Sequence, residues 1–307
     1  MCSLGYIMQP QSFGNEHTRK KLEAVQTYLG IFTTALKNRN FDLLYVDACA
    51  GSGSSIPKSA MPAVGGEIGQ IPLLPLEADA IDADQIIVGS AIRALAVENP
   101  FTRYLFNDIK PANVRALRSE IQNNFPHLAN RVSLTQFDAN EMLCRICDET
   151  NWKKSRAVVF LDPFGLQIKF DTLKKLARTQ AVDVWYLVPV FAMYRQVRGD
   201  GEVLSDGGRS VDEALGTDEW RTVVAKQELG PTDLFDDRAR RSTKAVDVAW
   251  FERVAHDRLK VAFDGRVLDQ VLPLGNRGLH EFSLMFAWAN PTPPARLAAK
   301  LAAAVLK

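Results

Sequence analysis

The chain has 307 residues, of which 47% are hydrophobic and 24% charged, and its formal net charge is +1 at pH 7. That composition is ordinary for a globular domain, and the near-neutral charge argues against a general nucleic-acid binder, which needs excess Lys and Arg against phosphates, while leaving a local basic groove open. With no apolar stretch of membrane-spanning length, no signal-peptide pattern and only four cysteines, we expect a cytoplasmic protein without a disulfide framework.

Helical and extended patterns alternate along the first two thirds of the chain. Apolar residues recur at helical spacing over residues 17–40, and a continuous apolar run over residues 41–47 is typical of a buried parallel strand. Further strands are predicted at 102–108, 131–140, 157–165 and 182–190, and further helices at 88–99, 111–124, 140–150 and 170–180. The alternation predicts an α/β fold with a doubly wound, mostly parallel, Rossmann-like sheet.

Two stretches interrupt this regular order within a single predicted domain, 1–307. Residues 54–87 are rich in Gly, Pro and small side chains, and we expect a loop insertion that is either a lid candidate or a tolerated insertion without a role. Residues 192–247 form a second, polar and helical insertion. A helix at 249–263, a C-terminal β-hairpin around 275–278 and a helix at 295–307 complete the predicted elements.

Acidic residues stand at the ends of four predicted strands: Asp47, Asp108, Asp138 and Asp162. Asp is common in such turns because it caps the following helix, so each one alone has a structural explanation. Four on one rim are harder to explain in that way. Because ligands of open α/β sheets bind beyond the carboxyl ends of the strands, we expect a ligand site at this rim.

The turn after the first strand, from Asp47 to Gly53, carries two glycines that allow a ligand to approach the backbone closely. It lacks both the GxGxxG spacing and the Gly-Lys-Ser/Thr of a P-loop, which disfavours an ATPase. Asp108 is placed to accept hydrogen bonds from ribose hydroxyls, and Asp138 to meet an adenine amino group. The pattern therefore favours a ligand that contains adenosine.

The sequence Asp162-Pro163-Phe164-Gly165 resembles the DPPY-type motif of amino-methylating enzymes, in which an acid or amide binds the target amine and an aromatic ring stacks on a flipped base. Here Phe replaces the second proline and Gly replaces the aromatic residue. Methylation of a nucleic-acid base is therefore the weaker of the functional hypotheses.

Other chemistry-bearing residues favour structural interpretations. Cys144 and Cys147 form a CxxC within a predicted helix, without the further ligands that a metal site requires. No GxSxG nucleophile elbow is present, which disfavours a hydrolase. His280 is expected to be structural, whereas His17 is placed to reach the rim. A basic cluster is expected to be a solvated face, with a phosphate-binding patch as the alternative: Arg238, Arg240, Arg241 and Lys244.

Several segments resemble, in order, those of the three-Cys-motif partner family, TcmP: HTRKKLEAVQTYL, YVDACAGSG, GSAIRAL, FNDIKPANV, FDAN, FLDPFGLQI and VDVWYLVPV. The resemblance covers His17 to about Val190. This family is similar to class I S-adenosylmethionine-dependent methyltransferases, and its usual partner protein carries the three cysteines. The resemblance implies the methyltransferase fold, S-adenosylmethionine as the cofactor and a possible three-Cys-motif partner.

Carried over residue by residue, the resemblance implies three groups of site residues. Those near the methionine part of the cofactor are Asp47, Ala48, Gly51 and Gly53; those near its ribose and adenine are Asp108, Ile109, Asp138 and Ala139; and those facing the methyl acceptor are Asp162 and Phe164. The insertion at 54–87 departs from the family pattern, since it interrupts the first strand–helix unit.

Three functions remain open from the sequence. The first is methyl transfer from S-adenosylmethionine to an undetermined acceptor, together with a partner protein. The second is a non-catalytic, methyltransferase-like subunit that binds a partner. The third is methylation of a nucleic-acid base.

Overall fold

The computed structural model of the chain describes residues 16–55, 87–228, 241–275, 278–293 and 295–306. The predicted lid candidate therefore lies almost wholly outside the described residues, as do Arg238, Arg240 and the side chain of His17.

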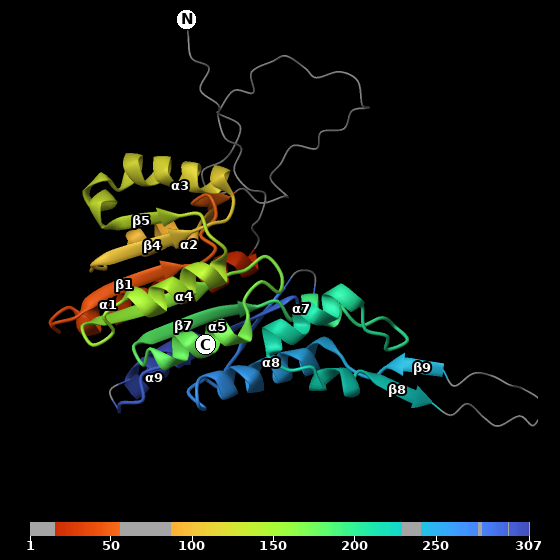
Figure 1. Cartoon of the computed structure of the whole chain (residues 1–307). Coiled ribbons are helices and arrows are strands. Elements are labelled where there is room, and N and C mark those ends of the chain that lie inside the picture. The colour runs from red at the N-terminus through yellow and green to blue at the C-terminus, as the bar shows by residue number, and fades with distance from the viewer. Residues whose placement is uncertain (1–15, 56–86, 229–240, 276–277, 294, 307) are drawn as a thin grey trace, which may run out of the picture.

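A seven-stranded sheet forms the centre of the molecule (Figure 1), in the order β10-β11-β7-β6-β1-β4-β5. The pairs β1/β4, β1/β6, β4/β5 and β6/β7 are parallel, whereas β11 is antiparallel to both β7 and β10. The predicted doubly wound, mostly parallel sheet with a C-terminal hairpin is confirmed. Its strands are β1 (Asp42–Asp47), β4 (Arg103–Asn107), β5 (Val132–Thr135), β6 (Ser155–Leu161), β7 (Val182–Val188), β10 (Leu272–Leu274) and β11 (Phe282–Trp288).

The order differs from that of the dinucleotide-binding fold, in which six parallel strands run 3-2-1-4-5-6. Here the antiparallel strand β11 lies between the fifth parallel strand, β7, and the edge strand β10. The sheet is thus of the methyltransferase-like type, and its first strand, β1, lies at the centre, where the strand order reverses.

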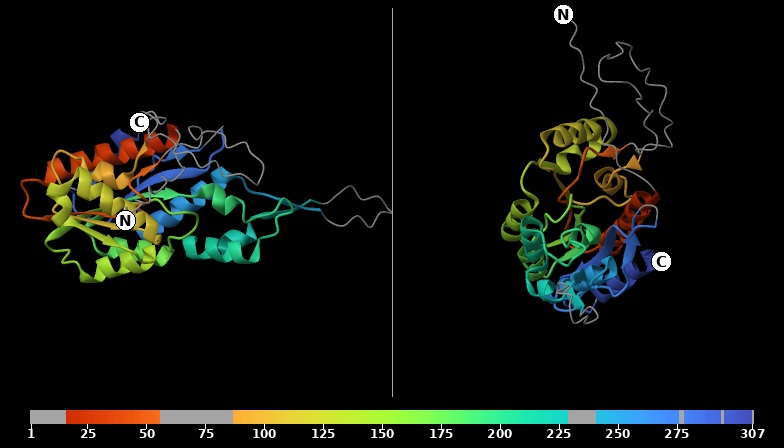
Figure 2. Two further views of the ribbon diagram at one scale, coloured as in Figure 1. Left: turned by 90° about the horizontal axis from the view of Figure 1, so that it is seen from above. Right: turned by 90° about the vertical axis from the view of Figure 1, so that its right-hand side faces the viewer.

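Helices cover both faces of the sheet (Figures 1 and 2). Alternate residues of each strand enter one of two hydrophobic clusters, because successive side chains of a strand point to opposite faces. One face packs against α4 (Ala139–Glu149), α5 (Phe170–Arg178), α7 (Ser205–Leu215) and α8 (Val248–Ala262); the other packs against α1 (Glu16–Leu36), α2 (Ser90–Leu95), α3 (Pro111–Asn124) and α9 (Ala295–Val305).

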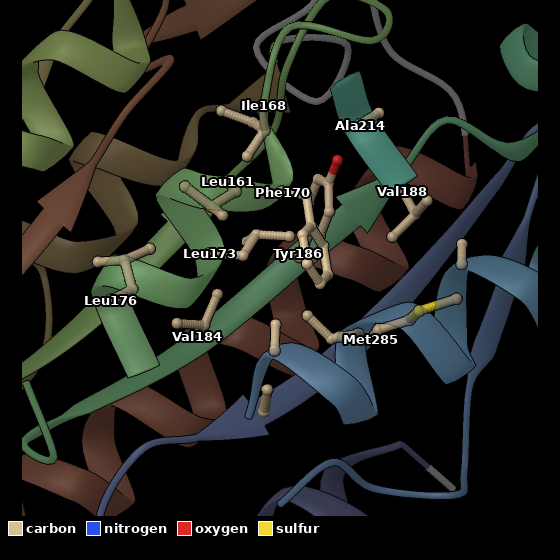
Figure 3. Packing of buried hydrophobic residues seen from close by; sticks show 14 of the residues in the cluster. Leu161, Ile168, Phe170, Leu173, Leu176, Val184, Tyr186, Val188, Ala214 and Met285 are labelled. Atoms are coloured by element: carbon tan, nitrogen blue, oxygen red, sulfur yellow. The ribbon is translucent and has the colours of Figure 1, made fainter. Parts of the chain in front are cut away.

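The first cluster is centred on Tyr186 of β7, which packs among Phe170 and Leu173 of α5 and Met285 of β11 (Figure 3). These side chains are at most 5% exposed. Their burial helps to hold β7 and β11 together near the carboxyl ends of the parallel strands, since Tyr186 pairs with Leu161, the last residue of β6.

Shorter elements connect these layers. They are β2 (Ser54–Ser55), β3 (Ile87–Val88), the turn η4 (Pro126–Arg131), α6 (Val190–Tyr194), the turn η5 (Glu219–Thr222), β8 (Ala225–Glu228) and β9 (Arg241–Lys244). The predicted insertion at 192–247 contains α7 and the antiparallel pair β8–β9, which extends away from the body of the molecule (Figure 2).

Several predicted elements were too long, among them the strand predicted at 157–165, which ends at Leu161, and the helix predicted at 17–40, which ends at Leu36. Val88 belongs to β3, where it pairs with Ser54, so the helix predicted at 88–99 begins only at Ser90. The strand predicted at 131–140 ends at Thr135, because the following residues turn toward β4 and then cap α4. Among the helices that the structure describes, none has both the length and the apolar surface needed to cross a lipid bilayer.

Candidate functional site

Asp47 ends β1 at the centre of the sheet and is fully buried. Its carboxylate accepts hydrogen bonds from the Cys49 amide at 3.2 Å and from Ser90 Oγ at 2.5 Å. Burial raises the pKa of Asp47 to about 7; the hydrogen bond from Ser90 opposes this rise, and the charge of Asp162 adds to it. Asp47 is therefore a buried acid that exchanges its proton near neutral pH.

The glycine turn after β1 needs its glycines. Gly51 and Gly53 have φ of 65° and 96°, values that other residues rarely adopt. At Gly53 a Cβ would also lie 3.1 Å from Leu117 of α3. The turn therefore packs directly against α2 and α3.

The two ends of the insertion at 54–87 are joined. Ser54 pairs with Val88 and Ser55 with Ile87, and the Gly89 amide donates to the Gly53 carbonyl at 2.7 Å. The helix α2 consequently begins beside the glycine turn and brings Ser90 to Asp47. The strand–turn–helix unit is thus intact in space although the sequence interrupts it.

Asp108 follows β4, next to β1, and is 5% exposed. Its Oδ2 accepts from the Gly51 amide at 3.0 Å, and its Oδ1 accepts from the Lys110 amide at 2.8 Å. A carboxylate has about four lone-pair positions, so each oxygen retains one. Two backbone amides therefore fix the carboxylate, and it keeps acceptor capacity for a pair of hydroxyl donors.

Asn107 joins the ends of three strands. Its amide group donates to the carbonyls of Ala48 at 3.1 Å and Phe137 at 3.0 Å. Its carbonyl oxygen accepts from Thr135 Oγ1 at 2.9 Å and from the Phe137 amide at 3.0 Å. This fully bonded, buried side chain sets the position of the turns after β1, β4 and β5 relative to one another.

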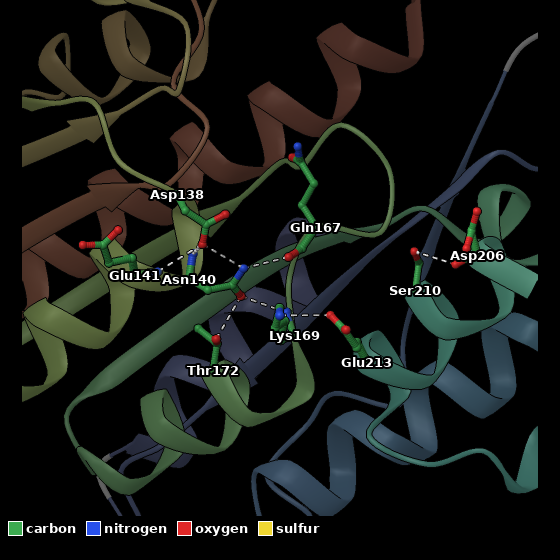
Figure 4. A network of polar contacts seen from close by, with 9 residues as sticks. All are labelled: Asp138, Asn140, Glu141, Gln167, Lys169, Thr172, Asp206, Ser210 and Glu213. Atoms are coloured by element: carbon green, nitrogen blue, oxygen red, sulfur yellow. Dashed lines mark hydrogen bonds and ion pairs between the residues drawn. The ribbon is translucent and has the colours of Figure 1, made fainter.

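Asp138 and Asn140 form the N-terminus of α4 (Figure 4). Asp138 caps the helix by accepting from the amides of Asn140 and Glu141, and Ala139 is the first residue of the helix. The Asn140 side chain donates to the Gln167 carbonyl at 2.8 Å and accepts from the Lys169 amide at 2.9 Å. The loop after β6 is therefore held by the cap of the preceding helix.

Asp162 and Phe164 lie in that loop. Asp162 is paired with Lys21 of α1, at 2.5 Å between Oδ2 and Nζ, and the lysine side chain is only 12% exposed. Phe164 is 48% exposed, and Lys110 Nζ lies 5.2 Å from its ring centroid. The loops after β4 and β6 thus meet across the turn of β1, which lies between them in the sheet.

Exposed apolar side chains line the same edge. Ile109 after β4 is 59% exposed, Phe137 after β5 is 36% exposed, and Leu279 before β11 is 54% exposed. Phe137 also lies under the guanidinium of Arg145, at 4.5 Å. Ile109 and Phe137, two apolar groups exposed to water near the buried Asp108, are a pattern expected of a binding site for a flat, partly apolar ligand.

Cys49 lies at the centre of this arrangement. Burial raises the pKa of its thiol well above the usual value, and the charges of Asp47, Asp162, Asp108 and Asp138 raise it further. The four carboxylates that the sequence singles out follow β1, β4, β5 and β6, which are neighbours in the sheet, so they lie along one edge. Two shallow surface depressions lie elsewhere, one lined by Lys244, Trp250 and Arg253, the other by residues of α1 and Glu98.

Several residues of the site were missed by the sequence analysis: Lys21, Ser90, Asn107, Lys110, Phe137 and Asn140. Asn107 and Phe137 directly precede predicted site residues, so their position at strand ends was a usable signal. Lys21 and Ser90 reach the site through contacts distant in sequence, and no local pattern marks them. Cys144 and Cys147 lie half-buried on α4, and no metal-binding cluster of three His, Cys, Asp or Glu side chains occurs among the described residues.

No protein-family model and no curated protein matches the chain, so the TcmP resemblance remains an expectation from its motifs. Among solved structures, the chain is similar to the protein LPL1258 from Legionella pneumophila. The identity is 14% and the TM-score 0.41, and the match covers 91% of this chain and 89% of that one. It is also similar to Trm1 from Pyrococcus horikoshii, solved with S-adenosyl-L-methionine (14%, TM-score 0.45, 94% of this chain and 59% of Trm1).

A third similar structure is the methyltransferase domain of bacterial CtHen1 (12% identity, TM-score 0.34, 86% of this chain and 99% of that one). These likenesses are distant. The methyltransferase-like fold stands on the strand order and register of the sheet itself.

Proposed function

We propose that this protein binds S-adenosylmethionine at the carboxyl edge of β1 and β4 and transfers its methyl group to an acceptor. The observation that carries the proposal is Asp108, held by the Gly51 and Lys110 amides with one acceptor position left on each carboxylate oxygen. Two free acceptor positions match the two hydroxyl groups of a ribose. Ile109 and Phe137 offer apolar surface to the adenine ring beside it.

The remaining roles follow the order of the strands. The turn from Asp47 through Ala48 to Gly51 and Gly53 receives the methionine part, and ionised Asp47 attracts its ammonium group. Asp138 and Ala139 form the far side of the adenine position. S-adenosylmethionine supplies an activated methyl group when bound, so the protein's main task is to align the acceptor with it.

Asp162 and Phe164 are proposed to face that acceptor. A carboxylate orients an acceptor group through a hydrogen bond, and an exposed aromatic ring offers a stacking surface. Lys21 neutralises Asp162 in the free protein. An acceptor that binds Asp162 must therefore replace or share this partner.

Calorimetric titration with S-adenosylmethionine and S-adenosylhomocysteine tests the proposal. Asp108→Ala should weaken binding by about 2 kcal/mol, close to thirtyfold in Kd, because hydrogen bonds to a charged acceptor are lost. Asp171→Ala removes an exposed carboxylate from α5 and serves as the matched control, with an unchanged Kd. Equal affinity of the wild type and Asp108→Ala would remove Asp108 from the site, and absence of binding to the wild type would end the proposal.

A second candidate is a methyltransferase-like subunit that binds a partner without catalysis. The Lys21–Asp162 pair favours it, because the carboxylate on the acceptor side is already occupied. The TcmP resemblance adds a three-Cys-motif protein as the proposed partner. To separate the two functions, the production of S-adenosylhomocysteine is measured with the chain alone and with the chain plus that partner. If nucleic acid is the acceptor, binding of the chain should appear as a salt-dependent shift in gels.

A further inference from the structure

A second polar cluster lies at the same edge of the sheet, on the side away from the proposed nucleoside position. It consists of Glu252 on α8, His280 just before β11, and Ser283 in β11. His280 Nε2 lies 2.8 Å from Ser283 Oγ and 3.1 Å from Glu252 Oε2, and Ser283 Oγ donates to the same carboxylate oxygen at 2.5 Å. Ser283 is fully buried, whereas about a quarter of the other two side chains is exposed.

The register of the strands gives the height of this cluster relative to Asp162. Leu161 of β6 pairs with Tyr186 of β7, and Val188, two residues further along β7, pairs with Ser283 of β11. Ser283 is therefore level with the turn that begins at Asp162. Because neighbouring strands are about 4.8 Å apart, the cluster lies two strand spacings away, about 10 Å along the edge. It contacts α8 on one face of the sheet, whereas Asp162 contacts α1 on the other.

The contacts determine which nitrogen of His280 carries the proton. The Glu252 carboxylate can only accept hydrogen bonds, and the Ser283 hydroxyl already donates its hydrogen to it. Both oxygens near Nε2, Glu252 Oε2 and Ser283 Oγ, therefore need a hydrogen-bond donor. Nε2 is thus protonated and Nδ1 carries the free lone pair. Among the described residues, Nδ1 has no hydrogen-bond partner, and a quarter of the His280 side chain is exposed.

A carboxylate that fixes one ring nitrogen of a histidine while the other is left free is the arrangement of a general base. Ser283 is excluded as a nucleophile because it is fully buried. Asp162 is already paired with Lys21, and Glu281, the acid that follows His280 in the chain, also has an interaction partner. His280 is therefore the group best placed to accept a proton on the acceptor side of the site.

We propose that His280 is the general base of the transfer reaction and that the acceptor is a hydroxyl or neutral N–H group. This proposal rests on the proposed function. As the acceptor oxygen or nitrogen bonds to the methyl carbon, the sulfur–methyl bond breaks and its electron pair remains on sulfur. The acceptor proton moves to His280 Nδ1. Leu279, exposed beside His280, provides apolar surface for the body of such an acceptor.

The first test is the protonation state of His280 in the wild-type protein, read from ¹⁵N chemical shifts of the imidazole nitrogens. We expect Nε2–H and an unprotonated Nδ1 for the neutral ring, and a loss of this preference in Glu252→Gln. A neutral ring with its proton on Nδ1 would overturn the proposal, because that nitrogen would then have no lone pair for the acceptor's proton.

The second test uses methyl 4-nitrobenzenesulfonate, a small methylating probe, with mass spectrometry of the products. His280 should be methylated several-fold faster than His256, whose Nε2 lies 2.7 Å from the Leu268 carbonyl, and exposed His127 gives the intrinsic rate. Glu252→Gln should slow the labelling of His280 alone.

The outcomes separate the two proposals. If calorimetry shows that neither nucleoside binds, the proposed function fails and His280 as its base fails with it. If the nucleosides bind and Asp108→Ala weakens their binding, but His280 is not preferentially labelled, only the base proposal is overturned.

Discussion

The amide of Gly89 donates a hydrogen bond to the carbonyl of Gly53, so the two ends of a long insertion meet beside the glycine turn. A Cβ at Gly89 would lie 2.8 Å from that carbonyl oxygen, closer than side chains are found. The contact lets α2 begin where it would begin without the insertion, and Ser90 reaches Asp47 as a result.

Gly89→Ala should therefore act on stability and on the ligand site together. Because the added methyl group pushes β3 away from Gly53, we expect a loss of about 1–3 kcal/mol in the free energy of unfolding. Ser90 should also withdraw from Asp47. Urea denaturation measures the change in stability, and calorimetric titration with S-adenosylmethionine measures the change at the ligand site. Gly30→Ala is the control: a Cβ there meets nothing within 4 Å, so this variant should not be destabilised.

Asn140→Ala should loosen the loop after β6. It leaves the Lys169 amide and the Thr172 hydroxyl without their acceptor and the Gln167 carbonyl without its donor. Because buried groups left unpaired cost about 1–3 kcal/mol each, we expect a destabilisation of at least about 2 kcal/mol. Hydrogen exchange should rise in residues 162–169 but not in β7. Unchanged exchange in that loop would show that other contacts hold it.

The affinity for S-adenosylmethionine should depend on pH through Asp47. Its pKa of about 7 in the free protein means that the carboxyl is largely protonated below pH 7, and a bound ammonium group requires it to ionise. Affinity should therefore rise up to about tenfold per pH unit below 7 and level off above it. Titrations in buffers of different ionisation enthalpy should detect the released proton.

Asp47→Asn supplies the control for this linkage. The amide cannot ionise, so binding should be weaker at pH 8, nearly independent of pH and without proton release. A pH profile of the variant that matches that of the wild type would assign the linkage to another group.

Asp183 makes the stability of the fold depend on pH. It is buried at the start of β7 and accepts from the Tyr28 hydroxyl at 2.6 Å. Burial raises its pKa to about 7, although the Tyr28 hydrogen bond and the nearby Arg156 charge oppose this. Since the folded pKa is raised, the stabilisation is fully present below the unfolded pKa near 4 and is lost as pH rises through 7.

The free energy of unfolding of Asp183→Asn should consequently fall less between pH 5 and pH 8 than that of the wild type. The fall in the wild type should exceed that in the variant by about 2–3 kcal/mol, because two pH units separate pH 5 from the folded pKa of about 7. Urea denaturation at both pH values measures it. Asp47 follows the same trend in both proteins, so a residual slope in the variant is expected; equal slopes would contradict the role of Asp183.

Much of the fold was predictable from local pattern. Apolar runs such as 41–47 and 182–190 become the central strands β1 and β7, because a strand buried on both faces needs an unbroken apolar sequence. The strand predicted at 131–140 was too long because Asn107, distant in sequence, binds Phe137 and ends the pairing. That contact leaves no periodic signal.

By itself, the sequence determined which strands are central and that acids stand at their ends, since both follow from the polarity of neighbouring residues along the chain. Only the tertiary structure decided that Ser90 meets Asp47, that Lys21 neutralises Asp162 and that Glu252 orients His280. Each of these contacts joins residues from different elements. Their formation depends on how the helices pack against the sheet, which no local pattern encodes.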